Sequence, residues 1–215
     1  MATKTISPLK PRKTPRQARS EATVDAICEA TIQVLLAEGA ARLTTTRVSE
    51  RAGVSVGTMY QYFPNKQALL FAVLKRHMEE VAGKVERVCL ANAGTDAADM
   101  LQNLLVTYFE AKTSDPEASA AIYGVVAELD VPELIAKFTN RIVKAIETML
   151  SSAADLEFTD VRLVTKMVHV AMIGVIRMIF EHRAGPAQIR KLHAELLLMC
   201  LSYVQAAGIA RAQAA

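Results

Sequence analysis

Apolar residues recur along most of this chain at three- and four-residue steps, the spacing that places side chains on one face of an α-helix. The first such stripe runs from Ile27 to Leu35 and is followed by Gly39, a residue type that commonly ends helices. Further stripes, separated by proline, glycine and capping residues, predict about nine helices, at residues 20–38, 44–52, 56–63, 66–89, 97–113, 116–129, 133–152, 159/160–183 and 187–207. No β alternation is visible, so the sequence predicts an all-α protein.

The most distinctive stretch is residues 43–70, which predicts two short helices, a tight turn between them and the start of a third helix. Thr44 and Thr45 can cap the first helix, because a hydroxyl oxygen accepts a hydrogen bond from an unpaired backbone N–H of the first turn. Gly53 supplies the left-handed residue of the turn, and Ser55 can cap the second helix. This arrangement is typical of a helix-turn-helix.

The second short helix has an unusual outward face. Its inward positions are Met59 and Phe63. The other face carries small or hydroxyl-bearing residues, namely Val56, Gly57, Thr58, Tyr60 and Tyr62. Small residues permit close approach to a DNA groove, and hydroxyls hydrogen-bond to phosphates or base edges, so this face predicts a recognition helix in the major groove.

Lys66 occupies the first turn of the following helix, after Pro64 and the capping residue Asn65. A lysine there is unfavourable to the helix dipole. Both the dipole and the lysine charge attract a phosphate, which gives the lysine a reason to be there.

Residues 44–70 resemble the DNA-binding signature of the TetR family of transcriptional regulators. The matching pattern is Thr44-Thr45-x-x-Val48-Ser49-x-x-Ala52-Gly53-Val54-Ser55-x-Gly57-Thr58-x-Tyr60-x-Tyr62-Phe63-x-x-Lys66-x-x-Leu69-Leu70. Ser49 departs from the family, which commonly has alanine there. With the chemistry above, the resemblance implies that Thr45, Arg47, Tyr62 and Lys66 hold phosphates, and that Val56, Gly57, Thr58 and Tyr60 lie at or near base edges; Thr44 and Ser55 complete the predicted DNA-binding set.

The resemblance also implies a domain organisation. We expect an N-terminal three-helix helix-turn-helix DNA-binding domain at residues 20–65 and a C-terminal helical ligand-binding and dimerisation bundle at residues 66–215. The helix at residues 66–89 would transmit the ligand signal. Residues 1–19 carry six basic residues and no acidic one, and we expect a flexible arm that follows the DNA backbone or, alternatively, a solvated tail.

Charge is distributed unevenly along the chain. The net charge is +3, but residues 1–76 hold twelve Lys/Arg and five Asp/Glu, whereas residues 77–215 hold thirteen and seventeen. A basic first third on an acidic remainder indicates that only the first third meets double-stranded DNA.

The last two predicted helices form the expected homodimer surface. Ala171 and Gly174 would allow a partner helix to approach closely. The second of the two helices carries a stripe of Ile189, Leu192, Leu196, Met199, Cys200 and Tyr203. By resemblance, two such helices from each chain would form a four-helix bundle; the alternative is that both stripes close the monomer core.

The helices between residues 97 and 183 carry a surplus of methionine and aromatic residues. Methionine fills irregular space and can repack around different ligands, so the surplus favours a pocket for an apolar or amphipathic small-molecule effector. The expected ligand-binding residues are Met100, Leu104, Tyr108, Tyr123, Phe138, Met167, His169, Met172 and Arg177. Each apolar member has the alternative of being ordinary core, and Arg177 has that of pairing locally with Glu181.

The sequence offers little support for other functions. The four histidines have no zinc-ligand grouping, no catalytic or nucleotide-binding motif is present, and we expect neither a metal nor a cofactor. Three widely spaced cysteines indicate buried thiols, with a redox sensor as the alternative. The apolar run 170–180 is too short to span a membrane and contains Arg177, so we expect a cytoplasmic protein.

The sequence thus predicts a repressor released from a palindromic operator by an effector. A DNA-binding activator or architectural regulator without a ligand is the main alternative, and a helical enzyme with an incidental helix-turn-helix is a third.

Overall fold

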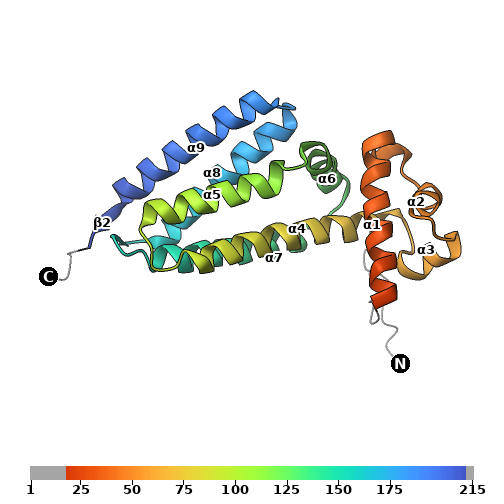
Figure 1. The fold of residues 1–215 in the computed structure, drawn as a ribbon, viewed down its shortest axis with the longest axis horizontal. Coiled ribbons are helices and arrows are strands. Elements are labelled where there is room, and N and C mark those ends of the chain that lie inside the picture. The colour runs from red at the N-terminus through yellow and green to blue at the C-terminus, as the bar shows by residue number, and fades with distance from the viewer. Residues whose placement is uncertain (1–17, 212–215) are drawn as a thin grey trace. The chain divides into compact units, whose positions relative to one another are not determined.

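The computed structural model describes residues 18–211 (Figure 1). The side chains of the predicted arm, residues 1–19, lie outside the described residues. Within the described range the chain forms nine α-helices, α1 (Ala18–Glu38), α2 (Thr45–Ala52), α3 (Val56–Tyr62), α4 (Lys66–Ala91), α5 (Ala97–Thr113), α6 (Pro116–Glu128), α7 (Pro132–Ser151), α8 (Val161–Glu181) and α9 (Pro186–Ala207). A short 3-10 helix, η1 (Ala40–Arg42), follows α1. The prediction of an all-α protein with about nine helices is confirmed.

Contacts between backbone positions divide the chain into two compact units. The first unit holds the described residues up to Met78 together with Glu117–Val131. The second holds Glu79–Pro116 and the residues from Pro132 onward. Helix α4 is continuous across the boundary between Met78 and Glu79, whereas α6 belongs to the first unit.

The first unit is built around the apolar stripe of α1. The buried residues of this stripe are Ile27, Ala30, Thr31, Val34 and Leu35. The hydroxyl of Thr31 donates to the Ile27 carbonyl at 2.7 Å, so this polar side chain is satisfied within the core. Helix α2 packs on α1, and α3 packs on α2. Because α2 and α3 have only eight and seven residues, this packing supplies the stability that such short helices lack alone.

The second unit is a helical bundle in which α5 contacts α7, α8 and α9. Its core is aliphatic with few aromatic rings, and the largest fully buried side chains include Met100, Leu101, Leu104, Leu105 and Ile146. Helices α8 and α9 run side by side in Figure 1 and contact each other. The unit therefore contains the helices of the predicted dimer surface and all of the predicted ligand-binding residues except Tyr123.

A two-stranded antiparallel ribbon in the second unit was not predicted. Strand β1 (Leu156–Phe158), between α7 and α8, pairs with β2 (Gly208–Ala210), directly after α9. The register places Glu157 opposite Ile209. Each strand has three residues, which is too short for an alternating pattern to be recognised in a sequence.

The N-terminus of α5 is capped by a residue that is distant in the sequence. Asp96 occupies the N-cap position, but its side chain makes no capping hydrogen bond. The carboxylate of Asp155 accepts the Ala97 N–H instead, at 2.8 Å. The sequence analysis missed this cap because its acceptor lies 58 positions along the chain.

Helix α8 is long and apolar enough to cross a membrane by length and composition alone, although the sequence analysis expected no such span. Within the second unit it packs on α5, α7 and α9, and 44% of its most apolar window is buried. The core helix of a soluble bundle can have the same length and composition, so these two properties alone are weak evidence for a membrane span.

Candidate nucleic-acid interface and ligand pocket

Both short helices begin with the predicted hydroxyl caps. Thr44 Oγ1 accepts the Arg47 N–H at 3.3 Å, and Ser55 Oγ accepts the Thr58 N–H at 3.0 Å. Gly53, between the helices, has φ 66° and ψ 28°, a left-handed conformation that costs a glycine little. Local signals in the sequence therefore set the geometry of the helix-turn-helix.

Helix α3 has a buried face and an exposed face. Met59 is fully buried, and Phe63, which follows the helix, is 1% exposed. On the opposite side Val56 is 40% exposed and Tyr60 is 44% exposed, and Gly57 is also exposed. An exposed apolar and aromatic face on a seven-residue helix is costly in water, so it indicates a surface that meets a partner.

A hydroxyl pair connects this face to the start of α2. The Thr45 Oγ1 and Tyr60 hydroxyl oxygens lie 3.2 Å apart, across fifteen positions of sequence. Ser55 and Thr58 form a second pair, with their hydroxyl oxygens 2.9 Å apart. Thr45, Ser55 and Thr58 thus lie at the N-terminal ends of α2 and α3, and the Tyr60 hydroxyl, from the second turn of α3, meets that of Thr45.

The two predicted phosphate-binding cations both reach the segment that follows α1. Arg47 forms an ion pair with Glu38 and donates to the Arg42 carbonyl at 3.1 Å, and Lys66 donates to the Ala40 carbonyl. The Arg47 side chain remains 46% exposed. The sequence analysis did not foresee Glu38 as a partner, because nothing local links residues nine apart across a turn.

Ser49, the departure from the family pattern, is 1% exposed. Its hydroxyl donates to the Thr46 carbonyl at 2.7 Å. Because the buried hydroxyl has this hydrogen bond, serine can replace alanine here with little loss of stability, and the helix-turn-helix accommodates it.

Most of the predicted ligand-binding residues lie in the core of the second unit. Those that are at most 5% exposed are Met100, Leu104, Tyr108, Phe138, His169 and Met172. Burial lowers the pKa of His169 and raises the pKa of Tyr108, so both side chains are neutral at pH 7. His169 and Tyr108 are thus neutral polar side chains within an otherwise apolar set of buried residues.

Three predicted ligand-binding residues do not join this buried group. Met167 is 50% exposed, and the Arg177 guanidinium is exposed and paired with Glu181 at 2.7 Å. Arg177 does not share the buried face of His169, because eight positions along a helix rotate a side chain by about 80°. Tyr123 belongs to the first unit and is 36% exposed.

Two polar atoms that the sequence analysis missed are buried in the second unit. Thr165 Oγ1 and His193 Nε2 have no hydrogen-bond partner among the described residues. Thr165 precedes His169 and Met172 by four and seven positions, so the three share one face of α8. His193 stacks on Phe109 of α5, with ring centroids 4.5 Å apart. Because an unpaired buried polar atom is costly, both atoms suit a ligand that offers a hydrogen bond.

Two family models match this chain. The model of the N-terminal domain of bacterial regulatory proteins of the tetR family matches residues 27–73. The model of a tetracyclin repressor-like C-terminal domain matches residues 96–203, half of the chain. The chain belongs to the TetR family. The resemblance noted in the sequence is thereby confirmed, and TetR-family proteins are DNA-binding transcription factors rather than enzymes.

Curated TetR-family relatives match part of the chain. The transcriptional repressor KstR of Mycolicibacterium smegmatis is 40% identical over 65 residues, which cover 30% of this chain and 32% of KstR. The transcriptional activator FasR of the same species is 25% identical over 130 residues, which cover 60% of this chain and 57% of FasR. The chain thus spans about a third of KstR and somewhat more than half of FasR.

Solved TetR-family structures match nearly the whole chain in fold. A TetR-family regulator from Mesorhizobium loti has a TM-score of 0.75 at 16% identity and covers 90% of this chain and 100% of its own. FadR from Bacillus subtilis, in complex with stearoyl-CoA, has a TM-score of 0.67 at 20% identity and covers 83% of this chain and 98% of FadR. Both comparisons support the same fold for this TetR-family chain.

The outer face of α8 carries an apolar stripe. Leu163, Met167 and Val170 are 54%, 50% and 64% exposed, and the exposed Gly174 continues the stripe by four positions. The exposed residues recur at steps of three and four, which is the pattern of a helix that packs against another. In this TetR-family protein the stripe lies on one of the two helices predicted to dimerise.

The predicted dimer stripe of α9 needs a correction. Leu196 and Cys200 are each 2% exposed, so they belong to the core of the second unit and cannot face a second copy. Met199 is 50% exposed and Leu198, which was not predicted, is 61% exposed. The outward apolar positions of α9 are thus offset by one residue from part of the predicted stripe.

The three cysteines are free and buried. Burial raises the pKa of Cys28 and of Cys200 to about 11 and that of Cys89 to about 12. The thiolate is the reactive form, so these thiols are inert at pH 7, which fits the interpretation of buried thiols rather than a redox sensor.

Proposed function

We propose that this TetR-family protein is a cytoplasmic, ligand-responsive transcriptional repressor that binds a palindromic operator as a homodimer. A small hydrophobic or amphipathic effector would release it from the DNA. The observation that carries the proposal is the exposed face of α3, in which Val56, Gly57 and Tyr60 stand out from a helix anchored by the buried Met59. The name of KstR as a repressor supports the sign of regulation.

In this proposal residues 20–65 read the DNA, and residues 1–19 follow its backbone as a basic arm. The side chains of Thr45, Arg47, Tyr62 and Lys66 bind phosphates, and Val56, Gly57, Thr58 and Tyr60 lie at or near base edges. Thr44 and Ser55 act chiefly as caps, because both hydroxyls already accept a backbone N–H. To bind a phosphate, Arg47 would have to release the Glu38 carboxylate or bind both anions at once. Either change adds an electrostatic cost to the contact between Arg47 and the phosphate.

Residues 66–215 would bind the effector and a second copy of the chain. The buried residues of α5, α7 and α8 would line the pocket, with Thr165 and His193 as hydrogen-bonding groups. Stearoyl-CoA bound to FadR, a protein of the same fold, supports an amphipathic effector. The effector must bind the DNA-incompetent form more tightly than the competent form, since equal affinity would shift nothing.

The apolar stripe of α8 supports dimerisation. Leu163, Met167 and Val170 would be covered by the second copy, which removes their exposed apolar area from water. Two recognition helices would then read half-sites about 34–36 Å apart, so specificity arises from both copies.

The test is binding to palindromes taken from the region upstream of the protein's own gene, measured by fluorescence anisotropy with a scrambled duplex as the control. Saturable, sequence-selective binding by a dimer is expected, followed by release on addition of an apolar or amphipathic compound. Binding only to non-palindromic or random DNA would refute the operator.

The alternative is an activator or an architectural regulator without a ligand. The relative FasR is named as an activator, which supports the first of these. A transcription assay on the bound promoter separates the two signs of regulation. Operator binding that no compound in a hydrophobic metabolite panel weakens would favour the architectural alternative.

A further inference from the structure

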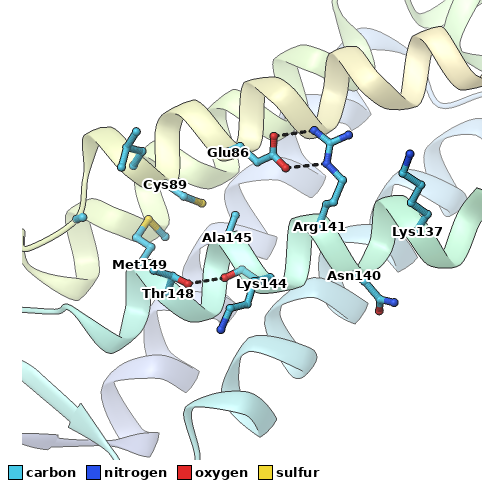
Figure 2. A pocket seen from close by; sticks show the side chains of 11 residues that line it. Glu86, Cys89, Lys137, Asn140, Arg141, Lys144, Ala145, Thr148 and Met149 are labelled. Carbon is cyan, nitrogen blue, oxygen red and sulfur yellow. Dashed lines mark hydrogen bonds and ion pairs between the residues drawn. The ribbon is translucent and has the colours of Figure 1, made fainter.

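A groove of about 600 Å³ lies between α4 and α7 in the second unit (Figure 2). Its apolar wall combines Cys89, Leu90 and Ala93 from the end of α4 and just beyond it with Ala145 and Met149 of α7. Leu90 is 80% exposed, which is a large unburied apolar surface for a leucine on a helix. None of the nine residues named above as predicted ligand-binding residues lines this groove.

One charged group in the groove is already neutralised. Arg141 binds Glu86 through two parallel hydrogen bonds, Nε to Oε1 at 2.8 Å and Nη2 to Oε2 at 2.7 Å, which Figure 2 shows as dashed lines. It also pairs with Glu79. This network lowers the pKa of Glu86, so the carboxylate stays ionised and occupied by Arg141.

Two lysines of the same helix remain weakly engaged. Lys137 lies 5.6 Å from the centre of the Phe138 ring and makes no ion pair with a described residue. Lys144 lies 3.9 Å from a Glu147 oxygen, beyond hydrogen-bond distance, and its side chain is 72% exposed. Both lysines line the groove, and their positions on α7 are seven apart, which is about two helical turns. In Figure 2 the Lys137 side chain points toward α4 and the Lys144 side chain points away from it.

We propose that this groove binds a small amphipathic anion, namely an acyl-chain carboxylate or thioester conjugate. Its acidic end would lie at Lys137 or Lys144, and its chain would cover Leu90 and Met149. The volume falls within the range of small-molecule sites, and the combination of an apolar wall with weakly engaged cations of α7 matches an apolar chain that carries a negative end. Binding in this groove does not depend on operator binding. Loss of the groove site would leave the proposed function intact, and failure of operator binding would leave the groove site intact.

The absence of tryptophan from this chain permits a local measurement. Leu90→Trp places a single tryptophan in the groove, at a position exposed enough to accept the larger side chain. Leu36→Trp, at an exposed position of α1 in the first unit, is the control reporter. We expect dodecanoate, below its micelle concentration, to shift the tryptophan emission of Leu90→Trp to the blue with saturation and to leave the emission of Leu36→Trp unchanged.

Charge dependence is tested with 1-dodecanol, which has the same chain without the carboxylate, and with Lys137→Gln/Lys144→Gln in the Leu90→Trp background. We expect both changes to weaken the apparent affinity about tenfold, since each removes the charge pairing. Lys191→Gln, at an exposed lysine of α9 in the same unit, should leave the affinity unchanged.

Three results would overturn the proposal. The first is that dodecanoate causes no saturable emission shift of Leu90→Trp. The second is that the control reporter shows an equal shift. The third is that dodecanol binds as tightly as dodecanoate, or that the double lysine variant binds dodecanoate as tightly as its parent. The thermal unfolding curve of the double variant should match that of its parent, because neither lysine is buried, and this separates loss of binding from loss of fold.

Discussion

The hydroxyl oxygens of Thr45 and Tyr60 lie 3.2 Å apart, so a single contact joins the first turn of α2 to the exposed face of α3. Both groups are on the proposed DNA-binding surface. A hydroxyl that is already oriented by a neighbour loses less freedom when it meets a phosphate or a base edge.

We therefore expect Tyr60→Phe to lower operator affinity about fivefold, the loss of about 1 kcal/mol for one hydrogen bond. The free energy of unfolding should change by less than about 0.5 kcal/mol, because the pair is exposed. Anisotropy and urea titrations measure the two quantities, with Tyr203→Phe of α9 as the control. An unchanged affinity would remove the Tyr60 hydroxyl from the interface.

Lys66→Ala should weaken binding to all DNA sequences by a similar factor. A phosphate contact carries no sequence information, and its loss should reduce the slope of log K against log salt by about 0.9. Lys75→Ala, at an exposed lysine of the same helix, is the matched control. A loss confined to the operator sequence would show that Lys66 reads bases.

His169 should make the protein sensitive to mild acid. Burial lowers its pKa, whereas a histidine of the unfolded chain titrates near 6.5, so below about pH 6.5 the unfolded chain takes up a proton that the native protein does not. The free energy of unfolding then falls with falling pH, by up to about 1.4 kcal/mol per unit for this group. His169→Gln should flatten the dependence of the free energy of unfolding on pH below about pH 6.5. An unchanged slope in His169→Gln would contradict the assignment.

The thiols should resist modification in the folded protein. With pKa values of about 11 to 12, the thiolate fractions are small at pH 8, and burial blocks access. We expect an aromatic disulfide reagent to react more than about a hundredfold faster in urea than in buffer, and to react faster as the pH of the buffer rises. One cysteine that reacts in buffer as fast as in urea would reopen the redox-sensor hypothesis.

Val170→Glu should convert a dimer into a monomer. The substitution puts a charge at the centre of the exposed α8 stripe, where a second copy would have to desolvate it. Light scattering after size exclusion measures the mass, and Leu36→Glu, at an exposed apolar position of α1, is the control. If Val170→Glu leaves the mass at that of a dimer, the copies meet elsewhere.

Short-range signals in the sequence predicted much of this fold. The bounds of α5 follow from its apolar stripe, and the caps at Thr44 and Ser55 and the turn at Gly53 each depend on residues within four positions. These features are local, so propensity and hydrogen-bonding chemistry suffice to predict them.

Contacts between distant residues were not predicted from the sequence. The Asp155 cap of α5, the ion pair of Arg47 with Glu38 and the β1–β2 ribbon each join positions that only the folded chain brings together. The same reason explains why Arg177 was placed in a pocket. Its neighbours in sequence are apolar, but the rotation of α8 turns it to solvent and to Glu181.

The ribbon of β1 and β2 has a consequence for α8 and α9. These helices are joined at one end by the residues between Glu181 and Pro186, and at the other end by backbone hydrogen bonds between Leu156–Phe158 and Gly208–Ala210. The two helices therefore form a closed hairpin whose mutual register is set before any second copy arrives. In the proposed homodimer, less ordering entropy would remain to be lost when two such hairpins meet, so assembly would start from a preformed surface.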